Sequence, residues 1–144
     1  MFKKITVAYN EAPEAERALL TAIQLAKSLG AELRTITVMT DLPAYTAFSA
    51  AGDPSLPQTL EDDRFRFYQR LQEKARLLAD SHGIEIASSM VEGRDVEAIL
   101  HHLREQSADL LVLGLHHRDL HIARLWSTVY ELAQESPCSV LGVH

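Results

Sequence analysis

Two patterns of apolar residues alternate along the first part of the chain. Residues 3–9 and 32–39 are short runs of β-branched and apolar residues, whereas residues 14–29 place apolar side chains three and four positions apart. Short runs of this kind are typical of strands, and the three-and-four spacing is typical of a helix with one buried face. Gly30 stands where a helix C-cap is expected. This part of the chain therefore predicts a right-handed strand, helix, strand unit.

The rest of the chain continues the alternation. Helical spacing predicts helices over 59–82, 96–106 and 129–134, and strand-length runs predict strands over 84–91, 109–113 and 139–143. The run at 109–113 is continuously apolar, as expected of a strand covered on both faces, whereas 84–91 is polar on one side and is expected at a sheet edge. Five strands alternating with four helices predict an α/β fold: a doubly wound five-stranded parallel sheet flanked by four helices, in one domain over 1–144.

Residues 40–58 interrupt this pattern. They contain Pro43, Gly52, Pro54 and Pro57 among small residues, with no sustained period, which predicts a long loop. Loops of this length are commonly lids or contact segments, and they are also found as disordered connections. Both interpretations stay open for this segment.

The segment after the run 109–113 is the strongest candidate for a ligand site. The apolar run ends at Gly114, a polar stretch with three histidines and two arginines follows, and Thr128 and Glu131 then have the spacing of a helix capping box. In open α/β sheets, ligands bind beyond the carboxyl ends of the strands, facing helix N-termini whose free N–H groups favour phosphate. We therefore expect the site at this junction.

Charge and hydropathy narrow the class of protein. A net charge of −6 and a pI near 5.6 argue against a general nucleic-acid binder, and no apolar run approaches the length of a membrane span. The start of the chain has no signal-peptide pattern, so we expect a cytoplasmic protein. The single cysteine, Cys138, has no partner for an internal disulfide and is expected to be a buried thiol.

Four stretches carry a family resemblance by their order and spacing. They are Lys-Lys-Ile-Thr-Val-Ala-Tyr near the start, Glu-Gly in the middle, Ala-Asp-Leu-Leu-Val-Leu-Gly before the polar stretch, and Ser-Pro-Cys-Ser-Val-Leu-Gly-Val near the end. Together they resemble the universal stress protein family over essentially the whole chain. The resemblance implies a Rossmann-like, adenine nucleotide alpha hydrolase-like fold and a homodimer paired through the C-terminal strand.

The nucleotide-binding branch of that family carries the motif G-x-x-G, nine residues, then G-[S/T]. The spacing is intact here, running from Gly114 through His117 to Ser127 and Thr128, but His117 and Ser127 replace two glycines. Glycine in such a loop lets the backbone approach phosphate without a Cβ in the way. These replacements predict weakened or lost ATP binding.

A second departure lies after the first strand. Asn10 stands where the family has an acidic residue that binds the adenine side of the nucleotide, and Glu11 and Ala12 replace a glycine and a serine or threonine. Asn10 still donates and accepts hydrogen bonds. The resemblance places the cofactor pocket at Ala8, Asn10, Val38, Leu113, Gly114, His117, Ser127, Thr128 and Val129.

Two functions stay open. The first is a non-enzymatic cytoplasmic stress-response protein, a homodimer with a diverged nucleotide pocket that acts through contacts with other proteins. The second is an ATP-binding member in which nucleotide binding or slow hydrolysis is a signal, with Mg²⁺ bound only together with ATP. The sequence has no G-x-S-x-G elbow and no Walker A loop, so we assign no catalytic residue. His117 and His121 lack a Cys pair or an H-E-x-x-H motif beside them, so we assign no metal site.

Overall fold

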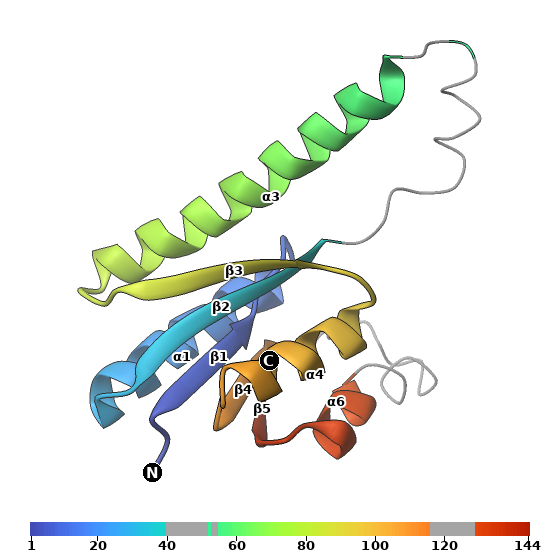
Figure 1. Cartoon of the computed structure of the whole chain (residues 1–144). Helices are drawn as coiled ribbons and strands as arrows, with labels where there is room; N and C mark the ends of the chain where they lie inside the picture. The colour runs from blue at the N-terminus through green and yellow to red at the C-terminus, as the bar shows by residue number, and fades with distance from the viewer. Residues whose placement is uncertain (40–51, 53–54, 116–128) are drawn as a thin grey trace.

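Five parallel strands form one sheet in the computed structural model, which describes residues 1–39, 52, 55–115 and 129–144 (Figure 1). The strands are β1 (Lys4–Ala8), β2 (Glu32–Met39), β3 (Ile86–Glu92), β4 (Leu110–Gly114) and β5 (Ser139–Val143). The described helices are α1 (Pro13–Leu29), α3 (Leu56–Ser81), α4 (Asp95–Glu105) and α6 (Val129–Glu135). The predicted fold class, a five-stranded parallel α/β sheet with helices on both sides, is confirmed.

The strand order is β3-β2-β1-β4-β5, with every neighbouring pair parallel. The chain therefore builds outward from β1 to β3, then returns to the other side of β1 for β4 and β5. The direction of winding reverses between β1 and β4, and this is the switch point at which open α/β sheets bind ligands.

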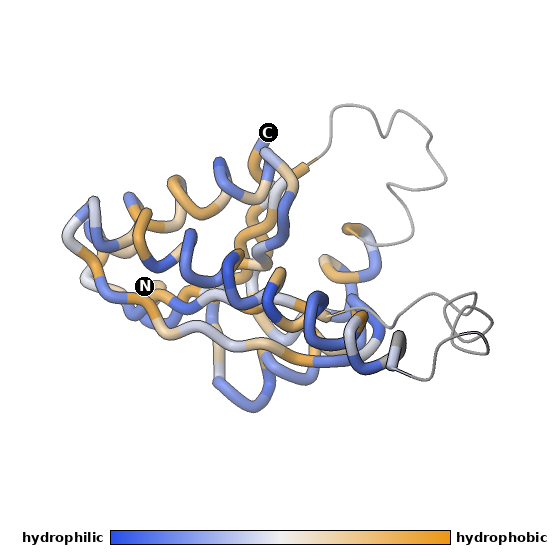
Figure 2. Tube along the Cα trace, turned by 90° about the horizontal axis from the view of Figure 1, so that it is seen from above, coloured by the Kyte–Doolittle hydropathy of each residue, from blue (hydrophilic) through white to orange (hydrophobic). Residues whose placement is uncertain are grey.

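Two apolar clusters hold the helices on the two faces of the sheet. On one face, α1 and α3 pack against side chains that include Ile5, Val7 and Val112. On the other face, α4 and α6 pack against side chains that include Ile36 and Leu111. Coloured by hydropathy, the helices alternate apolar and polar stretches around their turns, as helices with one buried face do (Figure 2).

Most expected boundaries agree with the structure within a few residues. Residues Leu110 to Leu113 of β4 are all buried, β3 lies at a sheet edge, and Gly30 ends α1 with φ of 64°. Helix α3 begins at Leu56, inside the segment predicted to be a loop. Pro57 lies in its first turn, where backbone N–H groups have no partner within the helix, so the missing N–H of proline costs no hydrogen bond. The rest of the predicted loop, and Thr128 of the predicted capping box, lie outside the described residues.

Cys138 is less buried than the sequence predicted. Its side chain is half-buried against the cluster beneath α4 and α6, and its Sγ lies 3.4 Å from the Ser136 hydroxyl. The turn before β5 brings Cys138 to the margin of this cluster rather than to its centre, which leaves the thiol partly accessible.

Buried polar groups are few in the described core, and His102 is the histidine among them. His102 is a residue of α4, its side chain is 4% exposed, and no described group hydrogen-bonds to its Nε2. Burial lowers the pKa of His102 below its ordinary value, and the nearby positive charge of Arg34 lowers it further. The imidazole is therefore neutral in the folded protein at neutral pH.

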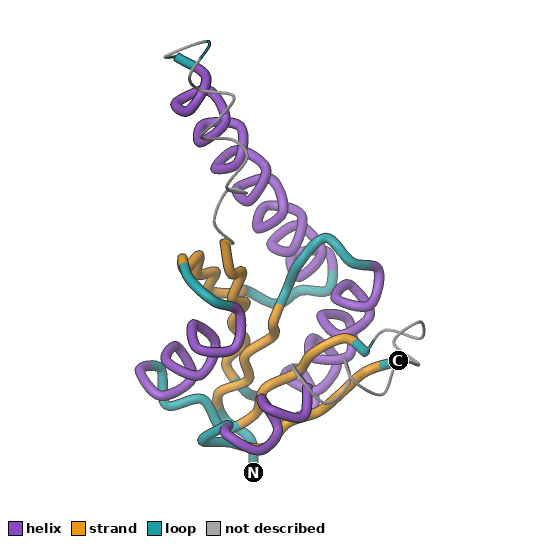
Figure 3. The backbone as a smooth tube through the Cα atoms, turned by 90° about the vertical axis from the view of Figure 1, so that its right-hand side faces the viewer, coloured by secondary structure: helices purple, strands orange, loops and turns teal. Residues whose placement is uncertain are grey.

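Helix α3 reaches well beyond the sheet. Its C-terminal half lies over the sheet with Leu71, Ala75 and Ala79 buried, whereas its N-terminal half projects past the strands (Figure 3). Phe65 and Phe67 on that half are close to half exposed. Among the described helices none, α3 included, combines the length and the apolar character needed to cross a membrane.

Candidate functional site

A cavity of about 280 Å³ lies at the carboxyl ends of β1, β2 and β4, at the switch point of the sheet. Its floor comes from residues at the ends of these strands, and its sides come from the first turns of α1 and α4, with α6 and α3 contributing one residue each. Its apolar lining residues include Ala8, Ile36, Val38, Ile99, Leu113 and Leu132. A concave, mostly apolar pocket with a few polar groups is the usual form of a small-molecule site.

Backbone hydrogen bonds fix the end of β1 beside the cavity. The Tyr9 N–H donates to the Ile36 carbonyl at 2.9 Å, and the Thr37 hydroxyl donates to the Tyr9 carbonyl at 2.9 Å. Tyr9 is almost fully buried, and burial raises the pKa of its phenol, so the ring is neutral. The residues that follow, Asn10 to Ala12, are thereby held at the mouth of the cavity.

Asn10 is the polar group best placed to recognise a ligand. Its Oδ1 accepts a hydrogen bond from the Ala12 N–H at 2.9 Å, which orients the side chain. Within the part of the chain that the structure describes, no group accepts from its amide nitrogen, and the residue lines the cavity. Asn10 can therefore offer amide N–H donors to an acceptor atom of a ligand, such as a ring nitrogen of a base.

Carboxylates dominate the charge of the described lining. Glu11, Glu14 and Asp95 all line the cavity, and none of the described lining residues is Lys or Arg. The Glu14 side chain is 13% exposed and lies 3.8 Å from Arg17, which is on the next turn of α1. The described walls therefore carry negative charge, which opposes a highly charged phosphate chain.

Gly114 ends β4 in direct contact with the start of α1. A Cβ added at Gly114 would lie 2.4 Å from the carbonyl carbon of Glu14 and 2.5 Å from its oxygen. Separations this short require the helix backbone itself to move. Glycine at this position therefore allows α1 to close against β4 beside the cavity.

The structure brings five of the site residues predicted from the sequence around one cavity. Ala8, Asn10, Val38, Leu113 and Gly114 all line it. Val129 begins α6 and is partly buried in the cluster on that face, but it does not line the cavity. His117, Ser127 and Thr128 lie outside the described residues, so the phosphate side of the predicted pocket stays a prediction; His121 lies outside them as well.

Several residues that line the cavity were not predicted from the sequence. Glu14 and Asp95 stand in the first turns of helices that follow strands, a position that could have identified them. Tyr68 reaches the cavity from α3, which comes from a distant part of the chain, and no local pattern identifies it. No group of three or more His, Cys, Asp or Glu side chains in the described portion is arranged to hold a metal ion.

The sheet order, the switch-point cavity and the helix starts around it define a doubly wound α/β protein of the Rossmann-like class. The chain belongs to the universal stress protein family, whose model matches residues 1–144. A universal stress protein of Thermus aquaticus, encoded in the 3′ region of a QAH/OAS sulfhydrylase, is 29% identical over 150 residues and covers 99% of both chains.

Solved structures agree on the fold. A universal stress protein UspA from Lactobacillus plantarum superimposes with a TM-score of 0.79 at 20% identity, covering 99% of this chain and 98% of that one. A universal stress protein in complex with cAMP superimposes with a TM-score of 0.77 at 23% identity, covering 99% and 97%. These similarities extend over the whole chain, including the strands that form the cavity.

Proposed function

We propose that this chain is a non-enzymatic cytoplasmic stress-response protein whose cavity binds an adenine nucleoside monophosphate, and that bound nucleotide controls its contacts with other proteins. The observation that carries the proposal is the composition of the cavity: apolar walls and the Asn10 amide for a base, with carboxylates and no described cation for the phosphates. Similar solved members of the fold carry cAMP, dAMP or AMP, each with one phosphate group.

The charge of the described lining residues favours a monophosphate over ATP. A phosphate monoester carries roughly −1.5 to −2 at neutral pH, and each further phosphate adds negative charge. The largely buried Glu14 and the exposed Glu11 and Asp95 repel that charge, and Arg17 offsets part of the charge of Glu14. The adenosine part, in contrast, gains from the apolar walls in every adenine nucleotide.

A second candidate is the complex of ATP with Mg²⁺. Carboxylate oxygens are ligands that Mg²⁺ prefers, and the ion is commonly held by one or two carboxylates together with substrate phosphates, so one of Glu11, Glu14 and Asp95 would be enough beside the nucleotide. In this alternative the metal enters only with the nucleotide and compensates the negative lining. The two candidates differ in their requirement for the metal.

Calorimetric titration separates these candidates. We expect AMP to bind at least about tenfold more tightly than ATP without metal, a difference of about 1.4 kcal/mol. Mass spectrometry of the purified protein should first establish whether nucleotide copurifies. If ATP with Mg²⁺ binds more tightly than AMP, the second candidate is correct. If neither nucleotide binds at millimolar concentration, the cavity does not serve as a nucleotide site.

We also propose that the protein is a homodimer paired through β5. This strand is an edge of the sheet and pairs only with β4 among the described strands, so its outward N–H and C=O groups are available to a second copy. Light scattering at micromolar concentration should return twice the 16.1 kDa mass of the chain. A monomer mass would contradict this proposal.

A further inference from the structure

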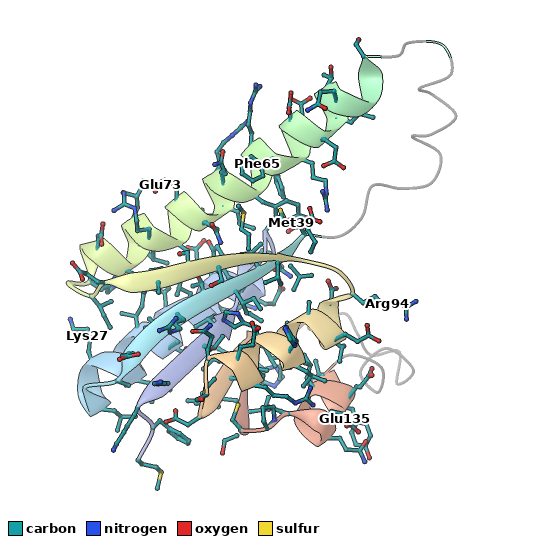
Figure 4. All side chains as sticks on the ribbon, in the orientation of Figure 1. Lys27, Met39, Phe65, Glu73, Arg94 and Glu135 are labelled. Atoms are coloured by element: carbon teal, nitrogen blue, oxygen red, sulfur yellow. The ribbon has the colours of Figure 1, made fainter. Side chains whose placement is uncertain are left out.

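A second hollow, of about 560 Å³, lies between α3 and the edge strand β3 and shares no described lining residue with the switch-point cavity. We call it the α3–β3 groove. Arg66, Gln69, Arg70 and Arg76 of α3 line it, together with Ser88 and Met90 of β3. Glu73, labelled in Figure 4, also lines it from the half of α3 that covers the sheet. Nothing in the fold or the proposed nucleotide function requires this groove.

The groove is positively charged on a chain of net charge −6. It holds three arginines and one carboxylate, Glu73, which is already engaged because the Arg76 Nε donates to it at 2.9 Å. Arg76 also donates to Asp80 at 2.6 Å. The cations that remain for a ligand are those of Arg66 and Arg70.

Arg66 and Arg70 are weakly engaged within the described protein. Arg66 approaches Asp63 at 3.9 Å with both side chains about two-thirds exposed, a geometry that contributes little stability. Arg70 makes no ion pair with any described residue. Both guanidinium groups are therefore available to carboxylates of a partner, which they can bind through paired hydrogen bonds.

The groove also contains a donor without an acceptor. The Gln72 side chain lines the groove, and its Nε2 is shielded from solvent with no hydrogen-bond partner in the described part of the chain. Leaving a buried donor unpaired is costly, and such groups in native structures are usually paired with protein, ordered water or a ligand. A partner in the groove could supply the missing acceptor.

One wall of the groove is an open sheet edge. Strand β3 pairs with β2 and with no other described strand, so its outer N–H and C=O groups face away from the sheet. Ser88 on this strand is exposed. An extended peptide can add to such an edge through main-chain hydrogen bonds and place alternate side chains in neighbouring pockets.

The spacing of the two arginines matches an extended peptide. Arg66 and Arg70 are four residues apart on α3, which places them about 6 Å apart along the helix axis. Side chains two residues apart on one face of a strand are separated by about 6.6 Å. We propose that the α3–β3 groove binds an extended acidic peptide that adds to β3, with two acidic residues, two positions apart, paired with Arg66 and Arg70.

The ends of β3 limit where the peptide can be acidic. Glu85 precedes the strand, Glu92 ends it, and both are exposed. Glu92 lies 3.8 Å from Arg64, which partly offsets its charge. The preferred peptide therefore carries its acidic pair in the middle, with uncharged residues at both ends.

Fluorescence anisotropy with a labelled peptide Ser-Val-Glu-Val-Glu-Val-Ser tests the proposal. The wild-type protein should bind it, and Arg70→Glu should weaken binding by at least about tenfold, because an ion pair is replaced by repulsion. Arg104→Glu is the matched control, since Arg104 is exposed on α4 outside the groove. This variant should bind within about twofold of wild type. Equal affinity of the two variants would overturn the proposal.

Two further measurements separate strand addition from other occupants. In an added strand the N–H groups of successive residues point to opposite sides, so one of any two neighbouring N–H groups faces β3. Of two peptides, N-methylated either at the central valine or at the glutamate after it, at least one should bind at least about tenfold more weakly than the unmethylated peptide. Unchanged affinity of both methylated peptides would overturn strand addition. Light scattering without peptide should give the same mass for wild type and Arg70→Glu. A different mass for the variant would mean that a second copy of the chain, rather than a peptide, occupies the groove.

Discussion

Replacing Gly114 with alanine is expected to lower the free energy of unfolding by about 3 kcal/mol. The added Cβ would lie 2.4 Å from the Glu14 carbonyl carbon, so either α1 or the end of β4 must move. In a chain of this length the change corresponds to a fall in melting temperature of roughly 10 °C. Thermal unfolding followed by circular dichroism measures it.

Gly83→Ala provides the control for this prediction. Gly83 has φ of 73° and open space around it, so alanine there meets backbone strain without a steric contact. The expected loss is about 1 kcal/mol. A Gly114→Ala variant that melts no lower than Gly83→Ala would show that α1 and β4 do not meet as closely as described.

The largest expected effect on binding comes from Ala8→Leu. Ala8 is half-buried at the carboxyl end of β1 and lines the switch-point cavity, so leucine adds three carbon atoms where the ligand should sit. We expect AMP affinity to fall by at least tenfold, about 1.4 kcal/mol or more, in a calorimetric titration.

Ala87→Leu makes the same substitution outside the cavity. Ala87 is exposed on β3, so this variant should keep wild-type affinity for AMP. Melting curves of both variants without nucleotide exclude loss of folded protein as the cause. If Ala8→Leu and Ala87→Leu bind AMP equally well, the ligand does not occupy the cavity at the ends of β1, β2 and β4.

The strands and helices of this fold could be predicted largely because burial leaves a strong pattern in the sequence. The continuous apolar run of β4 reflects a strand covered on both faces, and the serines of β3 reflect its place at an edge. The start of α3 could not be placed, since Pro57 suggests a loop as readily as the first turn of a helix.

The part of the site at and just after the strand ends was predicted from the family resemblance. Ala8, Val38 and Leu113 lie toward the carboxyl ends of parallel strands, at the edge where open α/β sheets bind ligands, and Asn10 follows β1 at the same edge. Tyr68 reaches the cavity through tertiary packing of α3, and Asp95 reaches it through the turn after β3. Both depend on how separate segments pack, which local sequence periods do not record.

The α3–β3 groove also could not be predicted from the sequence. The charged residues of α3 indicate only a solvated helix face. Arg66 and Arg70 become a candidate site because the sheet order leaves β3 at an edge beneath this helix, with Ser88 and Met90 opposite them. Neighbouring elements of the fold, rather than a sequence motif, bring these groups together.

The central claim is that the switch-point cavity binds an adenine nucleoside monophosphate. The most direct test is a titration of ¹⁵N-labelled protein with AMP, followed through backbone amide chemical shifts. The expected result is saturable shifts at Asn10, Leu113 and Gly114, with the amides of Arg70 and Ser88 in the α3–β3 groove unchanged. A spectrum that does not change at millimolar AMP, or shifts confined to residues outside the cavity, would contradict the claim.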